Sequence, residues 1–218
     1  MSSAETSRGD RGAKLVVATG NPHKVQEIRD ILVDDFTADQ LEGVVPLSNF
    51  DAPEPVEDGI TFVANALIKA RSAAQATGLP ALADDSGITV SVLGGAPGVF
   101  SARWSGTHGD DVKNRRLLLE QVASVPDEYR QAAFVAAIAI VWPDGREIVA
   151  EGAARGMLLR EESGEGGFGY DPIFVPDGHQ RTTAQMTPAE KNAISHRGNA
   201  LRKLTEPLRE ILGSNAGK

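Results

Sequence analysis

KLVVATGNPHKVQEIRDIL, residues 14–32, predicts a strand, a tight turn and a helix in direct succession. The apolar run Lys14–Thr19 is typical of a buried strand, and Gly20 begins the turn. Asn21 suits the N-cap of a helix, and Pro22 suits its first position. Apolar residues then recur at helical spacing, at Val25, Ile28 and Leu32. A strand that leads directly into a helix is typical of α/β proteins.

Helices and strands continue to alternate after this unit, and a hairpin comes late in the chain. The patterns predict strands at 44–47, 79–83 and 88–93, with helices at 61–77 and 110–123. We expect Asp84–Gly87 to form a turn between two of these strands. Residues 132–142 and 146–157 favour strands joined by Pro143-Asp144-Gly145. The fold class expected is therefore α/β, with a mixed β-sheet.

The last helix of the chain is predicted to be amphipathic. It follows a capping box, Thr187–Glu190, and Pro207 should kink it. Its apolar face would carry Leu201, Leu204, Leu208 and Ile211. This face and the apolar segment 94–100 (GGAPGVF) are expected to leave enough hydrophobic surface for a two-fold interface.

Length and composition limit the classes of function. The 218 residues suit one domain, expected at 14–212, between polar tails at 1–13 and 213–218 that we expect to be disordered. The chain has no cysteine, which excludes disulfides, thiolate metal sites and a cysteine nucleophile. A net charge of −8 argues against nucleic-acid partners. No apolar run approaches a membrane span and no signal core begins the chain, so we expect a cytoplasmic protein without membrane contact.

The turn after the first predicted strand is a candidate phosphate site. Free amides at a helix N-terminus favour anions, and Lys24 adds a positive charge in the first turn. A lysine there opposes the helix dipole unless an anion lies nearby. The candidate residues are Thr19, Gly20, Asn21, Pro22, His23 and Lys24. The alternative interpretation is an ordinary turn between strand and helix that carries a surface lysine.

Acidic residues provide candidate metal ligands. Asp84 and Asp85 follow an apolar strand, where ligand sites of α/β proteins usually lie. Mg²⁺ is commonly held by one or two carboxylates together with substrate phosphate oxygens. Adjacent strand residues point to opposite faces, so only one aspartate is expected to reach such a site directly. The acidic loop offers a second carboxylate, from Glu54, Glu57 or Asp58. The alternatives are an Asx-type turn and a solvated loop.

Two later segments provide candidate contacts to a planar base. In 166–172 (GGFGYDP), Phe168 has glycine on both sides and no neighbouring side-chain cover, so its ring can stack on a base. His196 and Arg197 are donors that suit a base edge with a carbonyl group, and Lys191 precedes them. A mobile loop with Phe168 in the core and a polar capping segment are the alternatives. Phosphate donors, a metal carboxylate, a stacking ring and base-edge donors together describe a nucleotide site.

The same segments resemble the inosine/xanthosine triphosphate pyrophosphatases, the Ham1-like family that acts on non-canonical purine nucleotides. The matching segments are ATGNPHK (18–24), EDGITFVANALIKA (57–70), ADDSG (83–87), LGGAPGVFSARWSG (93–106), GGFGYDPIF (166–174) and EKNAISHRG (190–198). They occur in the order of the family and cover residues 14–212. The resemblance implies an α/β fold with an elongated mixed β-sheet and flanking helices, in two lobes around a nucleotide-binding cleft. It also implies a homodimer and Mg²⁺-dependent hydrolysis of ITP, dITP and XTP to monophosphate and pyrophosphate.

The resemblance also implies a role for individual residues in phosphate and metal chemistry. Thr19 to Lys24 would bind the triphosphate, and Lys69 would be a further phosphate contact. Asp85 would be the catalytic and metal-binding carboxylate, and Ser86 would touch the substrate. Glu57 matches the second acidic position of the family, with Glu54 as the alternative.

The remaining implied roles concern the purine base. Phe168 would stack on the ring, and the neighbouring Gly169, Tyr170 and Asp171 would help to hold it. Lys191, His196 and Arg197 would contact the purine edge. Two other interpretations stay open: a Maf-like pyrophosphatase that prefers pyrimidine or modified bases, and a nucleotide sensor without turnover.

Overall fold

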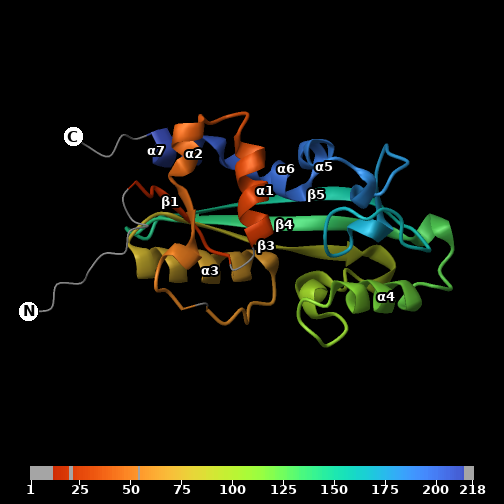
Figure 1. Ribbon diagram of the computed structural model, residues 1–218. Coiled ribbons are helices and arrows are strands. Elements are labelled where there is room, and N and C mark those ends of the chain that lie inside the picture. Colours follow the sequence, from red (N-terminus) through yellow and green to blue (C-terminus); the bar gives the residue numbers. More distant parts are fainter. Residues whose placement is uncertain (1–11, 20–21, 54, 214–218) are drawn as a thin grey trace, which may run out of the picture.

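The strand and helix expected from the first decisive segment are both present, as β1 (Leu15–Val17) and α1 (Pro22–Leu32) (Figure 1). The computed structural model describes residues 12–19, 22–53 and 55–213. The expected N-cap Asn21 lies outside them, as do the tails 1–11 and 214–218. Within the described part, Pro22 is the first residue of α1, as its fixed φ and missing N–H favour.

Six strands form one mixed β-sheet in the order β2-β1-β3-β4-β5-β6. β1 runs parallel to β2 (Val44–Pro46) and to β3 (Ala81–Val90). The other neighbours are antiparallel, and involve β4 (Gln131–Val141), β5 (Glu147–Leu158) and β6 (Phe174–Pro176). The predicted α/β class with a mixed sheet is therefore confirmed, and so is the predicted hairpin between β4 and β5.

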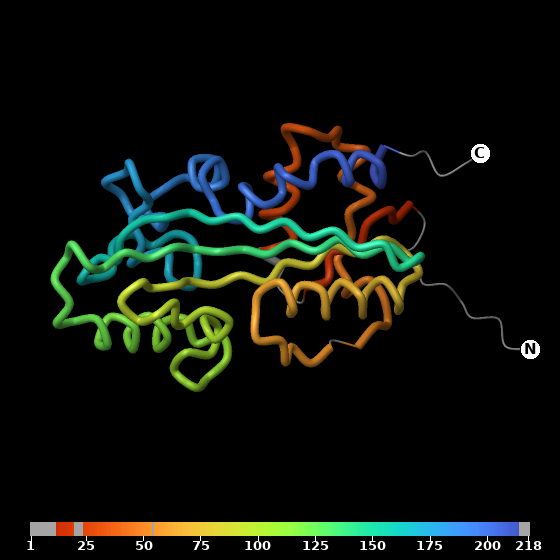
Figure 2. The backbone as a smooth tube through the Cα atoms, turned by 180° about the vertical axis from the view of Figure 1, so that it is seen from behind, coloured from red at the N-terminus to blue at the C-terminus, as the bar shows by residue number. Residues whose placement is uncertain are grey.

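Helices cover both faces of the sheet, as both views of the chain show (Figures 1 and 2). One face carries α1, α2 (Ala38–Glu42), α5 (Pro188–Ile194), α6 (His196–Leu201) and α7 (Thr205–Gly213). The other face carries α3 (Phe62–Thr77) and α4 (Asp111–Gln121) at opposite ends of the long strands. None of the helices within the described ranges is both long enough and apolar enough to cross a membrane.

The two faces of the sheet are packed with side chains of different size. Residues that alternate along each strand divide between them. Leu15, Leu82 and Ile138 face α1 and the C-terminal helices, where large aliphatic side chains fill the core. Val16, Ala81 and Ala137 face α3, whose inward side is a row of alanines. Small side chains on both partners allow α3 to approach the sheet closely, which brings its polar residues near β3.

Segment 84–87 is not the turn that its composition predicts. Asp84–Gly87 continues through the middle of β3, in an unbroken antiparallel ladder with β4 in which Asp84 pairs with Ile138. Ten paired positions outweigh the local turn preference of four residues. Gly87 meets a different need, because a Cβ there would lie 2.7 Å from the carbonyl oxygen of Gly98.

The predicted final helix is divided, and its apolar face is buried within the chain. A 3₁₀ turn at Arg202–Leu204 separates α6 from α7, just before Pro207 in the first turn of α7. The four expected apolar residues are 0–6% exposed and belong to the core under α1. The expectation that this helix provides an intersubunit surface is therefore wrong, because the sheet itself needs the cover.

Candidate active site

Asp84 and Asp85 lie side by side at the centre of β3, and their side chains point to opposite faces of the sheet. Asp84 points toward α1 and α6, where it contacts Lys24 and Arg197. Asp85 points toward α3, where it contacts Lys69. This alternation is the one expected of neighbouring strand residues, and it gives the two carboxylates separate environments.

The Asp85 side of the site contains two carboxylates that share one lysine. Lys69 Nζ lies 3.0 Å from Asp85 Oδ1 and 3.0 Å from Glu57 Oε2. Asn65, one helical turn before Lys69, donates its Nδ2 to Asp85 Oδ2 at 3.1 Å. Its Oδ1 accepts the N–H of Gly59 at 2.8 Å, and a Cβ on Gly59 would clash there. One buried amide therefore joins the acidic loop to Asp85.

Burial and charge act against each other on this side. Burial raises the pKa of Asp85 above its usual value, with Glu57 adding to the rise and Lys69 and Asn65 opposing it. Burial alone would lower the pKa of Lys69, but Asp85 and Glu57 outweigh it and hold the pKa above its usual value. Lys69 is therefore a stable cation between two carboxylates.

The Asp84 side is a buried cluster of four charges. Asp84 Oδ2 lies 2.9 Å from Lys24 Nζ and 2.9 Å from Arg197 Nη2, and accepts Ser86 Oγ at 3.2 Å. Arg197 Nη1 lies 2.6 Å from Glu27 Oε2, and Nη2 also reaches Ser86 Oγ at 3.1 Å. Two cations and two anions balance, which is how buried charges are tolerated.

Charge pairing dominates the titration of this cluster. Burial alone would raise the pKa of Asp84, but Arg197 and Lys24 outweigh it and hold the pKa far below its usual value. Burial alone would lower the pKa of Arg197, but Asp84 and Glu27 outweigh it and raise the pKa. Within the part of the chain described, Asp84 Oδ1, Glu27 Oε1 and Arg197 Nε are buried without a hydrogen-bond partner. Such atoms are costly unless a ligand or water reaches them.

His196 lies beside this cluster at the start of α6. Its imidazole stacks on Phe134, with ring centroids 5.1 Å apart and planes inclined by 17°. Burial, reinforced by the charge of Arg197, lowers the pKa of His196 well below its usual value. The ring is therefore neutral at pH 7 and offers one N–H donor and one acceptor.

The glycine-rich loop presents Phe168 and buries its neighbours. Phe168 is 38% exposed, and Lys191 Nζ lies 4.7 Å from its ring centroid. Asp171 Oδ2 accepts the N–H of Phe168 at 2.8 Å and Lys191 Nζ at 2.7 Å. Tyr170 is buried, and its hydroxyl donates to the Ser101 carbonyl at 2.8 Å. Tyr170 therefore anchors the loop, while Phe168 is the ring available to a ligand.

The sequence model of the Ham1 family matches residues 15–207 of this chain. The chain belongs to the Ham1 family. A dITP/XTP pyrophosphatase of Streptomyces coelicolor is 52% identical over 200 residues, which cover 92% of this chain and 99% of that protein. The dITP/XTP pyrophosphatase of Mycobacterium tuberculosis is 52% identical over 202 residues, 91% of this chain and 96% of its own length. The resemblance noted from the motifs is confirmed.

Solved structures of Ham1 proteins share the fold. A HAM1 protein from Coxiella burnetii superposes with a TM-score of 0.80 at 43% identity, over 90% of this chain and 98% of that one. The dITP/XTP pyrophosphatase of Mycobacterium abscessus superposes with a TM-score of 0.71 at 50% identity, over 87% of this chain and 97% of that one. The mixed α/β architecture described above is therefore the Ham1 fold.

Most of the residues predicted from the Ham1 motifs fall into three connected groups. Lys24, Ser86 and Arg197 surround Asp84. Glu57 and Lys69 adjoin Asp85. Phe168, Gly169, Tyr170, Asp171 and Lys191 form the loop group. His196 connects the last group to the first, because it lines a recess of about 10 Å³ together with Asp171 and Lys191 and precedes Arg197.

Part of the predicted phosphate segment cannot be assigned to these groups. Thr19 follows β1, and its N–H donates to the Val17 carbonyl at 3.0 Å. Pro22 and His23 begin α1, so their backbone lies at the helix N-terminus. Gly20, Asn21 and the alternative ligand Glu54 lie outside the described residues.

Four residues of the site were missed by the sequence analysis: Glu27, Asn65, Asp111 and Arg115. A signal exists for two of them, because Glu27 follows Lys24 by three positions and Asn65 precedes Lys69 by four on one helix face. Asp111 and Arg115 contact the glycine-rich loop from α4, which lies far from it in sequence.

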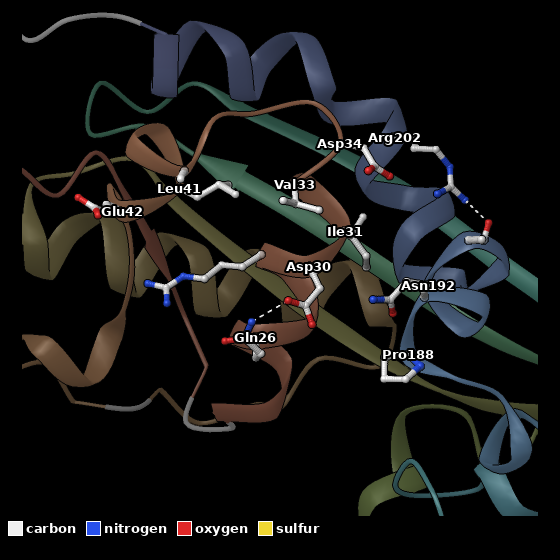
Figure 3. Close-up of a pocket in the computed structure, with 14 residues that line it drawn as sticks. Gln26, Asp30, Ile31, Val33, Asp34, Leu41, Glu42, Pro188, Asn192 and Arg202 are labelled. Atoms are coloured by element: carbon white, nitrogen blue, oxygen red, sulfur yellow. Dashed lines mark hydrogen bonds between the residues drawn. The ribbon is translucent and has the colours of Figure 1, made fainter.

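A pocket much larger than the recess beside His196 lies elsewhere. It has a volume of about 810 Å³ and is bounded by the outer side of α1, by α2 and by the start of α5 (Figure 3). Gln26, Asp30, Val33 and Asn192 are among the side chains around it. None of the predicted site residues that the structure describes lines it, so pocket size is no guide to the site in this protein.

The described residues offer few places where several metal-ligating side chains lie close together. No group of three or more His, Cys, Asp or Glu side chains within 12–19, 22–53 and 55–213 is arranged to hold an ion. The pair best suited to one is Glu57 and Asp85, whose oxygens already share the Lys69 ammonium. A hard cation held there would need further oxygen ligands from a substrate or water.

Proposed function

We propose that this chain hydrolyses ITP, dITP and XTP to the monophosphate and pyrophosphate, and so removes deaminated purines before they enter DNA or RNA. The observation that carries the proposal is the pairing of Asp84 and Asp85 with Lys24 and Lys69, at 2.9 and 3.0 Å. A triphosphate needs such cations, and a metal that accompanies it needs such carboxylates. The dITP/XTP pyrophosphatases that are 52% identical over nearly their whole length support the same activity.

The triphosphate would bind beyond the end of β1, beside the part of β3 that carries Asp84 and Asp85, with α1 on one face of the sheet and α3 on the other. From the predicted segment Thr19–Lys24, the backbone N–H groups of His23 and Lys24 at the start of α1 and the Lys24 ammonium would contact phosphate, and α3 would contribute Lys69. Lys24 pairs with Asp84 and Lys69 with Asp85. When a triphosphate binds, its oxygens would replace an aspartate oxygen as a partner of each lysine. Ser86, whose hydroxyl lies beside Asp84 and Arg197, would complete the contact with the phosphate chain.

The residues present fit Mg²⁺. Asp85 and Glu57 supply carboxylate oxygens that already share one cation, and phosphate oxygens would supply the remainder. When bound, the ion would neutralise charge on the phosphate oxygens. Glu54 is the alternative to Glu57 as the second carboxylate.

Asp85 would direct the attacking water at the α-phosphorus. Asn65 and Lys69 hold its two oxygens from the α3 side, at 3.1 and 3.0 Å, and so fix the plane of the carboxylate. A carboxylate fixed in this way can orient a water or accept its proton. Lys24, Lys69 and the start of α1 then stabilise the charge that moves to the pyrophosphate.

The purine would stack on Phe168, with its 6-carbonyl edge toward His196 and Arg197. Neutral His196 has one N–H to donate. Three of the five N–H groups of Arg197 already donate to Glu27, Asp84 and Ser86, so the Nε–H and the second Nη1–H are its spare donors. The recess beside Lys191 has a volume of about 10 Å³, close to that of one water, so the base would lie at its mouth.

The wider organisation follows from the same proposal. Residues 14–212 would form one domain with two lobes and the nucleotide cleft between them. A cytoplasmic homodimer would use the exposed surface near Phe100 and Val92, which are 52% and 48% exposed. Sedimentation should then report twice the mass of one chain.

Pyrophosphate release tests the function directly. We expect rapid release from ITP, dITP and XTP, and slow release from ATP and GTP, when each is supplied with Mg²⁺. Nucleotide binding without release would instead indicate a sensor. A preference for pyrimidine or modified nucleotides would indicate the Maf-like activity.

A further inference from the structure

The backbone of Gly169, next to the stacking ring, is held on both sides by one helix. Its N–H donates to Asp111 Oδ2 at 2.7 Å, and its carbonyl oxygen accepts Arg115 Nη1 at 2.8 Å. Asp111 and Arg115 are four residues apart on α4, so their side chains project from the same helix face. Such a grip fixes a peptide in position and in orientation.

The helix that makes this grip is itself firmly anchored. Asn114, between the two residues, donates to the Ala102 carbonyl at 3.1 Å and accepts the N–H of Ser105 at 2.8 Å. Leu118, on the next turn, is fully buried in the core under β3 and β4. Arg115 is 9% exposed and pairs with Glu162 at 3.0 Å. The two hydrogen bonds from Asp111 and Arg115 to Gly169 therefore connect the glycine-rich loop to a helix that is fixed in the core.

The loop needs such support, because its own sequence gives it little. Gly167 and Gly169 have φ values of +72° and +59°, a region that glycine enters freely. Phe168 is partly exposed, and Lys191 is its ring contact from outside the loop. Its direction therefore depends on the backbone bonds at either side: Asp171 on the Phe168 N–H, and α4 on Gly169.

We propose that Asp111 and Arg115 are positioning residues for purine binding, acting through Gly169 on the direction of the Phe168 ring. This inference rests on the proposed function. A ring already fixed at the stacking angle loses less freedom when the base binds, so the grip should appear as affinity for the nucleotide. A grip that only stabilised the fold would leave that affinity unchanged.

Asp111→Ala tests the inference, because it removes the acceptor of the Gly169 N–H from a partly exposed position. The probe is the α,β-methylene analogue of ITP with Mg²⁺, which resists cleavage, with affinity measured by calorimetry. We expect Kd to rise about 5- to 10-fold, the usual effect of one lost hydrogen bond. With ITP, KM should rise by the same factor and kcat should change less than about 2-fold.

Two matched variants separate positioning from general damage. Asp111→Asn keeps an oxygen acceptor and should bind the analogue nearly as well as the original chain. Arg116→Ala changes an exposed neighbour on the same helix and should leave Kd, KM and kcat unchanged. Thermal unfolding of each variant confirms that folded protein is compared.

A double-mutant cycle with Phe168→Ala tests whether Asp111 acts through the ring. If it does, Asp111→Ala should cost little additional affinity once the ring is absent. Additive losses would overturn the inference, and so would an unchanged Kd for Asp111→Ala alone. Binding of the analogue without release of pyrophosphate from ITP would instead contradict the proposed function and leave this cycle interpretable.

Discussion

Asp84 and Asp85 are the same residue type at consecutive positions of one strand, yet they differ in burial, in charged partners and in the direction of their pKa shifts. Asp84 is almost fully buried, faces two cations and has a lowered pKa. Asp85 is half-buried, shares Lys69 with a second carboxylate and has a raised pKa. The difference arises from the alternation of the strand, which sends one side chain to each face of the sheet. We therefore propose that Asp84 holds the site together and that Asp85 performs its chemistry.

Removal of divalent metal should abolish the activity that depends on the Asp85 side and leave the stability provided by the Asp84 cluster almost unchanged. We expect EDTA to abolish pyrophosphate release and Mg²⁺ to restore it, because the Asp85 side lacks the charge needed to hold a triphosphate alone. The unfolding temperature should stay within a few degrees, because the Asp84 cluster carries its own cations. Full activity after exhaustive chelation would remove the metal from the proposal.

Asp84→Ala should be the most destabilising single change in the comparison. It leaves Arg197 and Lys24 buried or half-buried with only Glu27 to balance them. We expect the free energy of unfolding to fall by about 3 kcal/mol or more, as for other broken buried pairs. Urea denaturation at pH 7 measures this. Asp35→Ala, which removes an exposed partner of Arg209, is the control and should cost under about 1 kcal/mol.

The loss of stability caused by Asp84→Ala should depend on pH. A carboxylate whose pKa is lower in the folded state stabilises the fold above its unfolded pKa of about 4, and this contribution is lost as pH falls. The stability gap between the original chain and Asp84→Ala should therefore be full at pH 7 and should narrow below about pH 4. A gap that widened in acid would contradict the lowered pKa of Asp84.

Asp85→Asn should give the opposite result to Asp84→Ala. The shape of the side chain is kept, and so is one of its two bonds to Asn65 and Lys69, because an amide has a single oxygen acceptor. The charge and the proton acceptor are lost. We expect kcat to fall about 100-fold or more, with little change in stability. Steady-state pyrophosphate release and thermal unfolding decide between the outcomes. Near-normal turnover would remove Asp85 from the catalytic role.

Arg197→Lys should produce the smallest of these effects, and the property that changes should be the selectivity for ITP over ATP. Lysine keeps a positive charge near Asp84 and Glu27, but it loses the planar fork and the Nε–H. We expect the ratio of kcat/KM for ITP over ATP to fall about 10-fold, mainly through lost activity on ITP. An unchanged ratio would show that Arg197 serves only the Asp84 cluster.

The chain's local patterns predicted most elements of the fold. Thr61 caps α3 and Gly78 ends it in the left-handed conformation, as their residue types favour. Pro143-Asp144-Gly145 joins β4 to β5, and the capping box at Thr187 begins α5. In each case the residues that determine the structure are neighbours in sequence. The motifs also indicated the family, because their order along the chain is itself sequence information.

The tertiary structure decided where these patterns were overruled and how the site was assembled. Asp84–Gly87 became strand because pairing with β4 outweighed its turn preference. The apolar face expected at a dimer interface was buried because the sheet required cover on that side. Glu27, Asn65 and Asp111 contact residues of other elements, and no local pattern indicates which residues those are. Long-range contacts depend on which elements come together, and that is a property of the whole fold.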